Sequence, residues 1–392
     1  MSSSLRQSCR AVALLCVAAL VAGGCRSERA QPAPITGAGP GHPSVARVWV
    51  GPMPFSSGRA LRPDFATVLG DPQAWPEVLA RADVFKSYIM LLPEVPLSGK
   101  TTPEVSTAHL QALADLLRRR RLQTAFEVGG LRQGDALPRR GEWGRQVAAN
   151  ELTHLRRWLA AGGRIDYLTT DHALMMNIGS FYYSPGFRDC GLSLAEAAGE
   201  LADYFQALHA AIPDAKFGVI ESLGFFHVSG PNGRVYVRTV PKLPVWRFED
   251  YLETLLAAMA QRGLTLDHFH IDFGYEGVLH DGGGPAAGTL DYGRIRGVER
   301  CLQARGVRAG VIVNAFHDTR VETPEPDTAN REAAANTERF WRGYVDAGGR
   351  AEDLVFQTWQ PFPDRTGPES DPDTVLGLYR RLLPDRARTD AP

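Results

Sequence analysis

The feature of this sequence that most limits its fold is a repeated alternation of short apolar runs and longer helix-like segments. Each run holds β-branched or aromatic residues, as buried strands do, and most runs end in a polar residue. Strands that alternate with helices pair in parallel, because the helix carries the chain back to the starting edge of the sheet. The eight runs are Val45 to Val50, Val84 to Leu91, Leu122 to Val128, Ile165 to Asp171, Lys216 to Glu221, Leu266 to Phe273, Val307 to Asn314 and Leu354 to Trp359.

Eight such units are the number that closes a (β/α)8 barrel, so we expect one barrel domain over residues 45–392. We expect enlarged loops after the fourth, fifth, sixth and eighth strands. The turns before four of the strands share one design, in which a glycine in the left-handed conformation ends the helix. A doubly wound open sheet uses the same turns and is the alternative fold. These glycines are found in the pairs Gly162-Gly163 and Gly348-Gly349 and at Gly263 and Gly306.

The N-terminus has the order of an export signal. Arg6 and Arg10 precede the apolar run Ala11 to Val21, and the small residues Ala22-Gly-Gly lead to Cys25. This order resembles a bacterial lipoprotein signal, although Ala22 stands where that family more often has leucine. The resemblance implies a signal peptide over residues 1–24, acylation of Cys25, for example with palmitate, and a lipid anchor in the bacterial cell envelope, on the periplasmic or cell-surface face. An ordinary secretory signal is the alternative.

Residues 25–44 are rich in Pro, Gly, Ala and Ser and are expected to form a flexible tether. The 392 residues carry a net charge of -1, which gives no reason to expect nucleic acid as a partner. Two cysteines lie in the expected barrel. Cys190 and Cys301 either pair in the exported protein or stay as separate thiols.

Function is expected at the carboxyl ends of the strands, where a barrel gathers its catalytic side chains. Four consecutive strands carry an acid there, namely Glu127, Asp171, Glu221 and Asp272. Because side chains alternate between faces, each acid should line the barrel together with residues two and four positions before it. The expected companions are Ala125 for Glu127, Thr169 and Tyr167 for Asp171, Val219 and Phe217 for Glu221, and His270 and His268 for Asp272.

A single acid at such a position often caps the next helix. Four acids at one rim raise one another's pKa, so the cluster costs stability unless a proton, a cation or a substrate resolves it. Polar and aromatic residues near the rim are candidates for contacts with substrate. We expect Lys86 either to pair with a rim acid or to extend toward the bottom of the barrel. The candidate substrate-binding residues are Lys86, Glu127, Trp246, His270, Tyr275, Asn314 and Trp359.

An exported barrel with paired carboxylates and aromatic loops resembles a glycoside hydrolase, across residues 45–384 and without a specific family signature. The resemblance implies hydrolysis of a poly- or oligosaccharide without a cofactor. Asp171 matches the nucleophile of several such barrels, and Glu221 or Asp272 matches the acid/base. We expect Glu221 to be the acid/base because its apolar neighbours favour the protonated form. The chain departs from the largest clan, which has Asn-Glu on the fourth strand and Glu in place of Asn314.

Two other functions remain open. The side chains of Glu127, Asp171, Glu221, His270 and Asp272 also form a plausible shell for one divalent metal ion. Such a shell resembles that of sugar isomerases, epimerases and related metal-dependent barrels, including lyases. The third possibility is a lipoprotein that binds glycans without turnover.

Overall fold

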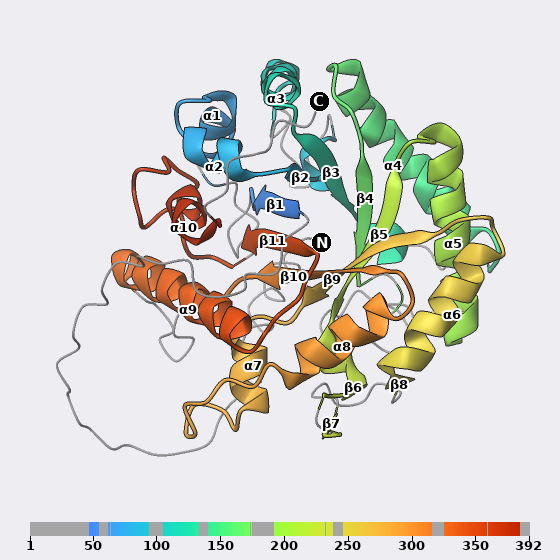
Figure 1. Cartoon of the computed structure of the whole chain (residues 1–392). Helices are drawn as coiled ribbons and strands as arrows, with labels where there is room; N and C mark the ends of the chain where they lie inside the picture. Colours follow the sequence, from blue (N-terminus) through green and yellow to red (C-terminus); the bar gives the residue numbers. More distant parts are fainter. Residues whose placement is uncertain are drawn as a thin grey trace, which may run out of the picture.

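Eight parallel strands form a closed barrel in the computed structural model (Figure 1). The structure describes residues 47–54, 62, 64–93, 105–132, 140–172, 174, 192–231, 233–237, 246–315, 325–358 and 360–384. Around the barrel the strands follow the order β1, β11, β10, β9, β5, β4, β3, β2, and β2 pairs with β1 to close it. This closure confirms the (β/α)8 barrel over the open sheet. The strands are β1 (Arg47–Pro52), β2 (Val84–Tyr88), β3 (Gln123–Val128), β4 (Tyr167–Asp171), β5 (Lys216–Ser222), β9 (Leu266–Asp272), β10 (Arg308–Val313) and β11 (Asp353–Thr358).

Helices surround the barrel on its outer side (Figure 1). Side-chain caps begin several of them, and α5 opens with a capping box in which Ser193 and Glu196 satisfy each other's backbone N–H groups. The second strand ends earlier than predicted, because Ile89 starts a short 3-10 turn, η1 (Ile89–Leu91). The helices are α1 (Phe65–Gly70), α2 (Pro76–Arg81), α3 (Thr107–Arg119), α4 (Trp143–Ala160), α5 (Leu194–Ala211), α6 (Phe248–Ala260), α7 (Tyr275–Asp281), α8 (Gly293–Gln303), α9 (Pro326–Asp346) and α10 (Val375–Leu382).

The turns from helix to strand follow the predicted design. Gly162, Gly263, Gly306 and Gly348 have φ angles of 85°, 70°, 70° and 73°. These angles lie in the left-handed region, which glycine adopts without the steric cost that a Cβ would add. Each turn therefore lets a helix reverse directly into the next strand, at the end of the barrel opposite to the strands' carboxyl ends.

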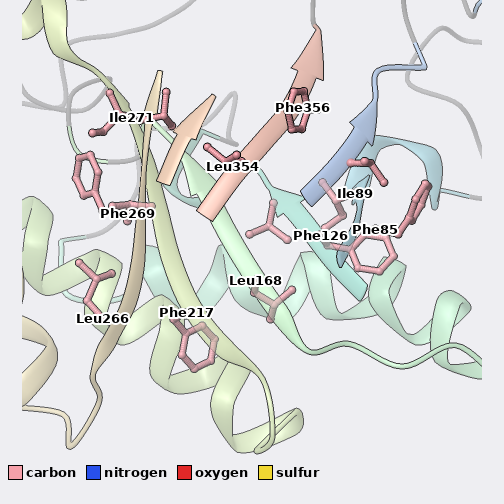
Figure 2. Packing of buried hydrophobic residues seen from close by; sticks show 14 of the residues in the cluster. Phe85, Ile89, Phe126, Leu168, Phe217, Leu266, Phe269, Ile271, Leu354 and Phe356 are labelled. Atoms are coloured by element: carbon pink, nitrogen blue, oxygen red, sulfur yellow. The ribbon is translucent and has the colours of Figure 1, made fainter. Parts of the chain in front are cut away.

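The hydrophobic core has two layers. The larger layer lies between the strands and the helices, where Phe126, Leu168, Phe269 and Ile271 point outward from their strands (Figure 2). The smaller layer fills the barrel itself with one apolar side chain from each of seven strands. These are Trp49, Val84, Ala125, Tyr167, Ile220, Ile312 and Val355.

The sixth barrel strand along the chain, β9, gives histidines to the inside of the barrel. The rings of His268 and His270 lie 5.3 Å and 4.7 Å from the ring of Trp49, measured between centroids. His268 also bonds to Thr169 across the barrel, at 2.8 Å between Nε2 and Oγ1. The expected inward faces of β4 and β9 are therefore confirmed.

The expected inward face of β5 is wrong. Ile220 belongs to the inner layer, whereas Phe217 and Val219 belong to the layer under the helices. The ring of Phe217 lies 4.9 Å from that of Phe205 on α5, on the helix side of the strand (Figure 2). Glu221 shares the face of Phe217 and Val219, as predicted, but this is the outer face. The regular pairing of β5 with β4 sets this face, because Phe217 lies beside the outward Leu168. The pairing with β9 shifts between Phe217 and Gly218, where β9 has one extra residue.

The loops after β5 and β9 carry elements of their own. After β5 come η3 (Leu223–Phe225) and a small sheet of β6 (Phe226–Ser229), β7 (Val235–Tyr236) and β8 (Trp246–Arg247). The loop after β9 contains α7. Arg294 joins these two loops from a buried position, because it pairs with Asp281 at 2.7 Å and donates to the backbone oxygens of Leu223 and Phe226. Most of the predicted long loop after β4 lies outside the described residues.

Within the part of the chain that the structure describes, no helix is both long and apolar enough to span a bilayer. The predicted signal and tether, with Cys25, lie outside that part, as does Cys190. Cys301 lies half-buried on α8 and forms no disulfide with any described residue.

Candidate active site

Three carboxylates from three strands surround one imidazole ring, that of His172. Nδ1 of His172 lies 3.2 Å from Oε2 of Glu221. Nε2 lies 3.5 Å from Oδ1 of Asp171 and 4.0 Å from Oδ2 of Asp272. The structure therefore brings together the three predicted catalytic acids, and it places between them a histidine that was not among the predicted site residues.

The local fold fixes His172 in this position. It follows Asp171 directly at the end of β4, and its φ of 50° lies in the left-handed region, which is sparsely populated for residues other than glycine. Its backbone N–H donates to the oxygen of Ile220 on β5, at 2.9 Å. The ring of Phe225 meets the imidazole edge-on, with centroids 5.6 Å apart. His172 is thus held in place both through its backbone N–H and through its ring.

The charges at this site are set by burial and by neighbours. Burial alone would lower the pKa of His172, but the charges of Asp171, Glu221 and Asp272 outweigh burial and raise the pKa to about 9. Burial raises the pKa of Asp272 to about 6, with the negative charges of Asp171 and Glu127 adding to this rise and the cation of His172 opposing it. His172 is therefore an imidazolium, and it lies beside a carboxyl group, that of Asp272, whose pKa is near neutrality.

Glu221 differs from the other two acids because its side chain is completely buried. Burial raises the pKa of Glu221, and hydrogen bonds from His172 and Tyr251 act in the opposite direction. The Tyr251 hydroxyl donates to Oε1 at 2.7 Å. By contrast, the side chains of Asp171 and Asp272 are 20% and 14% exposed, so these two acids can be reached from the rim.

A second polar cluster lines the barrel next to the first. Nζ of Lys86 lies 2.7 Å from Oε2 of Glu127 and also bonds to Gln357. Nε2 of Gln357 donates to the same carboxylate at 3.1 Å. Of the two expectations for Lys86, pairing with a rim acid is confirmed. Its ammonium group is fully buried and neutralises Glu127, so the predicted direct contact of Lys86 with substrate is replaced by support of Glu127.

His270, which was predicted to bind substrate, lies one layer below the rim. Its ring is completely buried between Trp49 and His268, and its Nε2 lies 3.8 Å from Oδ2 of Asp353. Burial lowers the pKa of His270 to about 3, so the ring is neutral. A ring in this position packs the inside of the barrel and does not reach a substrate at the rim.

The remaining predicted residues lie in different surroundings. Asn314 follows β10 and is almost fully buried, and its Nδ2 has no hydrogen-bond partner among the residues described here. Tyr275 opens α7 and Trp246 lies on β8, and both side chains are partly buried against the outer core. Trp359 lies outside the described residues. The donor of Asn314 is thus without a partner among the described residues, but it is buried, as the ring of His270 is.

The proposed metal shell is not assembled as predicted. His270 lies in the layer below the acids, and Glu221 is turned to the helix side of β5. Among the described residues, no group of three or more His, Cys, Asp or Glu side chains is arranged to hold a metal ion.

Two residues of this site, His172 and Tyr251, were not predicted from the sequence. His172 directly follows the predicted nucleophile Asp171. A histidine at this position could have been predicted to join the site, because its imidazole can pair with the acids at the rim. Tyr251 lies on α6, 30 positions after Glu221, and no local pattern marks it. Only the packing of α6 against β5 brings its hydroxyl to the carboxylate.

The fold and the site together define a class of protein: an eight-stranded parallel barrel with acidic side chains at the carboxyl ends of its strands. Solved glycoside hydrolase barrels have a similar course of the chain. A GH10 endoxylanase from a sugarcane soil metagenome is 12% identical, with a TM-score of 0.49 over 86% of this chain and 95% of its own. The GH53 catalytic domain of Ignisphaera aggregans is also 12% identical, with a TM-score of 0.47 over 88% and 98%. A hyperthermophilic chitinase domain from Pyrococcus furiosus is 12% identical, with a TM-score of 0.42 over 88% and 97%.

No protein-family model matches the chain, and no curated protein matches it. Identities this low do not transfer a reaction or a substrate. The function must therefore be argued from the residues of this chain.

Proposed function

We propose that this protein is a glycoside hydrolase that acts on a poly- or oligosaccharide. The observation that carries the proposal is the pair Asp171 and Asp272. Both carboxylates are partly exposed at the strand ends, and both lie within 4.0 Å of one nitrogen of His172. The two oxygens that face this nitrogen therefore lie no farther apart than the sum of those two distances, which is below the upper limit of about 9.5 Å for two carboxylates that act on one glycosidic bond.

The two acids of such a pair need opposite protonation states. The pKa of about 6 makes Asp272 able to hold a proton near neutral pH and to donate it to the leaving-group oxygen. Asp171 lies beside the imidazolium, and a cation 3.5 Å away stabilises its negative charge. Asp171 then attacks the anomeric carbon in a retaining reaction, or activates water in an inverting one.

This division of roles differs from the one expected from the sequence. Glu221 has the raised pKa expected of a proton donor. Its carboxylate, however, is completely buried and engaged by Tyr251 and His172, so it does not reach a glycosidic oxygen. Asp272 therefore takes the role of acid/base in the proposed mechanism.

Another residue of the rim suits the binding of sugar hydroxyls. Glu127, 14% exposed, can accept from one while Lys86 holds its charge. We further propose that the protein is exported and held by lipid on Cys25, which would place this rim in the cell envelope in contact with glycans.

Substitution of the two acids tests the proposal. Asp171→Asn should abolish hydrolysis of every substrate, because no leaving group removes the need for a nucleophile or base. Asp272→Asn should lower turnover of natural glycans by about 10²–10⁴-fold and spare aryl glycosides with good leaving groups, which need little proton donation. Added azide should restore the second step if the enzyme is retaining.

Asp203→Asn is the matched control, since Asp203 pairs with Arg262 on the outer helices, far from the rim. It should keep wild-type activity. If Glu221→Gln, and not Asp272→Asn, spares activated substrates, the acid/base is Glu221. Glycan binding by a wild-type protein that hydrolyses nothing would favour the binding lipoprotein.

Chelation separates the hydrolase from the metal-dependent alternatives. Activity that depends on two carboxylates alone should survive prolonged treatment with EDTA. Activity that is lost on chelation and returns with Mn²⁺ or Zn²⁺ would support the isomerase- or lyase-like enzyme.

A further inference from the structure

We propose that Tyr251 and Glu221 are positioning residues that hold His172 as a cation between Asp171 and Asp272. The catalytic meaning of this relay rests on the proposed hydrolase function. The contacts themselves do not, so the relay can be tested in a protein whose substrate is unknown.

A continuous chain of hydrogen bonds runs from the helix layer to the rim. The hydroxyl of Tyr251 on α6 donates to Oε1 of Glu221 at 2.7 Å. Oε2 of the same carboxylate accepts from Nδ1 of His172 at 3.2 Å. Both oxygens of this buried acid are therefore engaged, which is the condition under which a charged carboxylate can remain inside a protein.

The two positioning residues have no access to substrate. Tyr251 and Glu221 are completely buried. The ring of Tyr251 is fixed against Phe226, with centroids 4.8 Å apart, and is stacked with Phe248 at 6.3 Å. The hydroxyl thus reaches Glu221 from a rigid site, and any effect of either residue on the reaction must pass through His172.

The outer-face position of Glu221 makes this arrangement possible. An acid on the inner face of β5 would join Asp171 and Asp272 at the rim and add a like charge there. On the outer face it meets α6 instead, and it contacts the rim only through the imidazole. On this outer face Glu221 supports the histidine instead of acting as a fourth rim acid.

The ring is oriented by this support. Because Nδ1 faces Glu221, Nε2 is left to face the two reacting acids. The charged and titratable groups around the imidazole are Asp171 from β4, Glu221 from β5 and Asp272 from β9, with the Tyr251 hydroxyl of α6 behind Glu221. Burial alone would make this imidazole neutral, so its charge depends on these carboxylates.

The imidazole pKa of His172, measured by NMR on protein labelled at histidine, is the decisive readout. The signal is assigned by its absence from His172→Asn. Glu221→Gln keeps a hydrogen-bond acceptor for Nδ1 but removes the charge, and it should lower the pKa of His172 by about one unit or more. Tyr251→Phe, which removes one donor to Glu221, should lower the same pKa by less.

Tyr344→Phe is the matched control. Tyr344 is also a buried tyrosine that donates to a buried glutamate, Glu299, but this pair joins α9 to α8 away from the rim. It should reduce stability and leave the titration of His172 unchanged. If Glu221→Gln does not fold, Tyr251→Phe against Tyr344→Phe gives the same comparison.

Activity provides a second readout once a substrate is known. Tyr251→Phe should lower kcat, by up to about 100-fold, with little change in KM, because misplacement of a catalytic group affects the reaction more than binding. An unchanged pKa of His172 in both Glu221→Gln and Tyr251→Phe would overturn the relay, even in an active hydrolase. A shifted pKa in a protein without hydrolase activity would keep the relay and reject the proposed reaction.

Discussion

At the scale of single residues, His172 decides the charge of the whole rim. Without it, Asp171, Glu221 and Asp272 would be three acids in a poorly solvated space, and at least one would be forced to take up a proton. The imidazolium neutralises one of these charges and lies close to all three. The rim can therefore hold an ionised and a protonated acid side by side, as the proposed reaction requires.

This charge arrangement predicts how stability changes with pH. The pKa of His172 is raised from its ordinary 6.5 to about 9 in the folded protein, so the folded state binds the proton more tightly than the unfolded state. The resulting stabilisation, on the order of 3 kcal/mol, is fully present below pH 6.5 and is lost as the pH rises through 9. Urea unfolding between pH 6.5 and 9.5 should show a loss of stability that is much smaller in His172→Asn.

Asp272 contributes a separate and more acidic window. Its pKa of about 6 also lies above its ordinary value, so its contribution to stability declines as the pH rises from about 4 to 6. For the His172 prediction, the contradicting outcome is a free energy of unfolding that changes with pH in the same way in wild type and in His172→Asn between pH 6.5 and 9.5. That result would show that the imidazole is not charged in the folded protein.

At this scale the sequence predicted where three of the four acids would lie. Alternation along β3, β4 and the part of β9 from His268 onward places Glu127, Asp171 and Asp272 at the rim, because these segments pair regularly with a neighbouring strand. It failed for Glu221, because alternation separates the two faces of a strand without showing which face turns inward, and the inner face of β5 is that of Ile220.

At the scale of elements, β5 and β9 pack closely because Gly218 on β5 has no side chain. A Cβ added at Gly218 would come far inside van der Waals contact with the ring of His268. His268 has no room to move, because it bonds to Thr169 and packs on Trp49. The shifted pairing of β5 therefore depends on glycine at this one position.

Gly218→Ala should destabilise the protein by about 1–3 kcal/mol or more, as overpacking of a tight core does. Gly199→Ala is the control, because a Cβ at Gly199 on α5 would meet nothing closer than Nη2 of Arg262, at 3.6 Å. It should be neutral or stabilising by about 0.5–1 kcal/mol, the usual gain for alanine in a helix. Equal denaturation midpoints for the two variants would contradict this account of β5.

At the scale of the whole molecule, the alternation of strands and helices was enough to predict the barrel. Eight apolar runs and four glycine turns leave few other ways to pair the strands. The sheet at β6, β7 and β8, and the joining of two loops by Arg294, could not be predicted in the same way. Arg294 reaches the backbone of Leu223 and Val237 across more than 45 positions, and the strands of the small sheet are only two to four residues long, so neither follows a period.

The N-terminal signal gives a prediction about the location of the molecule. Cys25→Ala should move the protein from the membrane fraction to the soluble fraction, because one acylated cysteine is the proposed anchor. Cys301→Ala, which removes a thiol on α8, should leave the fractionation unchanged. A Cys25→Ala protein that stays with the membrane after cleavage of its signal would exclude the lipid anchor.

All eight strands run in one direction, so they begin at one end of the barrel and finish at the other. Arg47 opens β1 beside Asp353, the first residue of β11, so the chain enters the barrel at its base. The acids stand at the opposite mouth. If the residues before Arg47 hold the protein to a bilayer, as proposed, the mouth is the end of the barrel farther from the point of attachment. A long polymer could then reach it without passing between the barrel and the lipid.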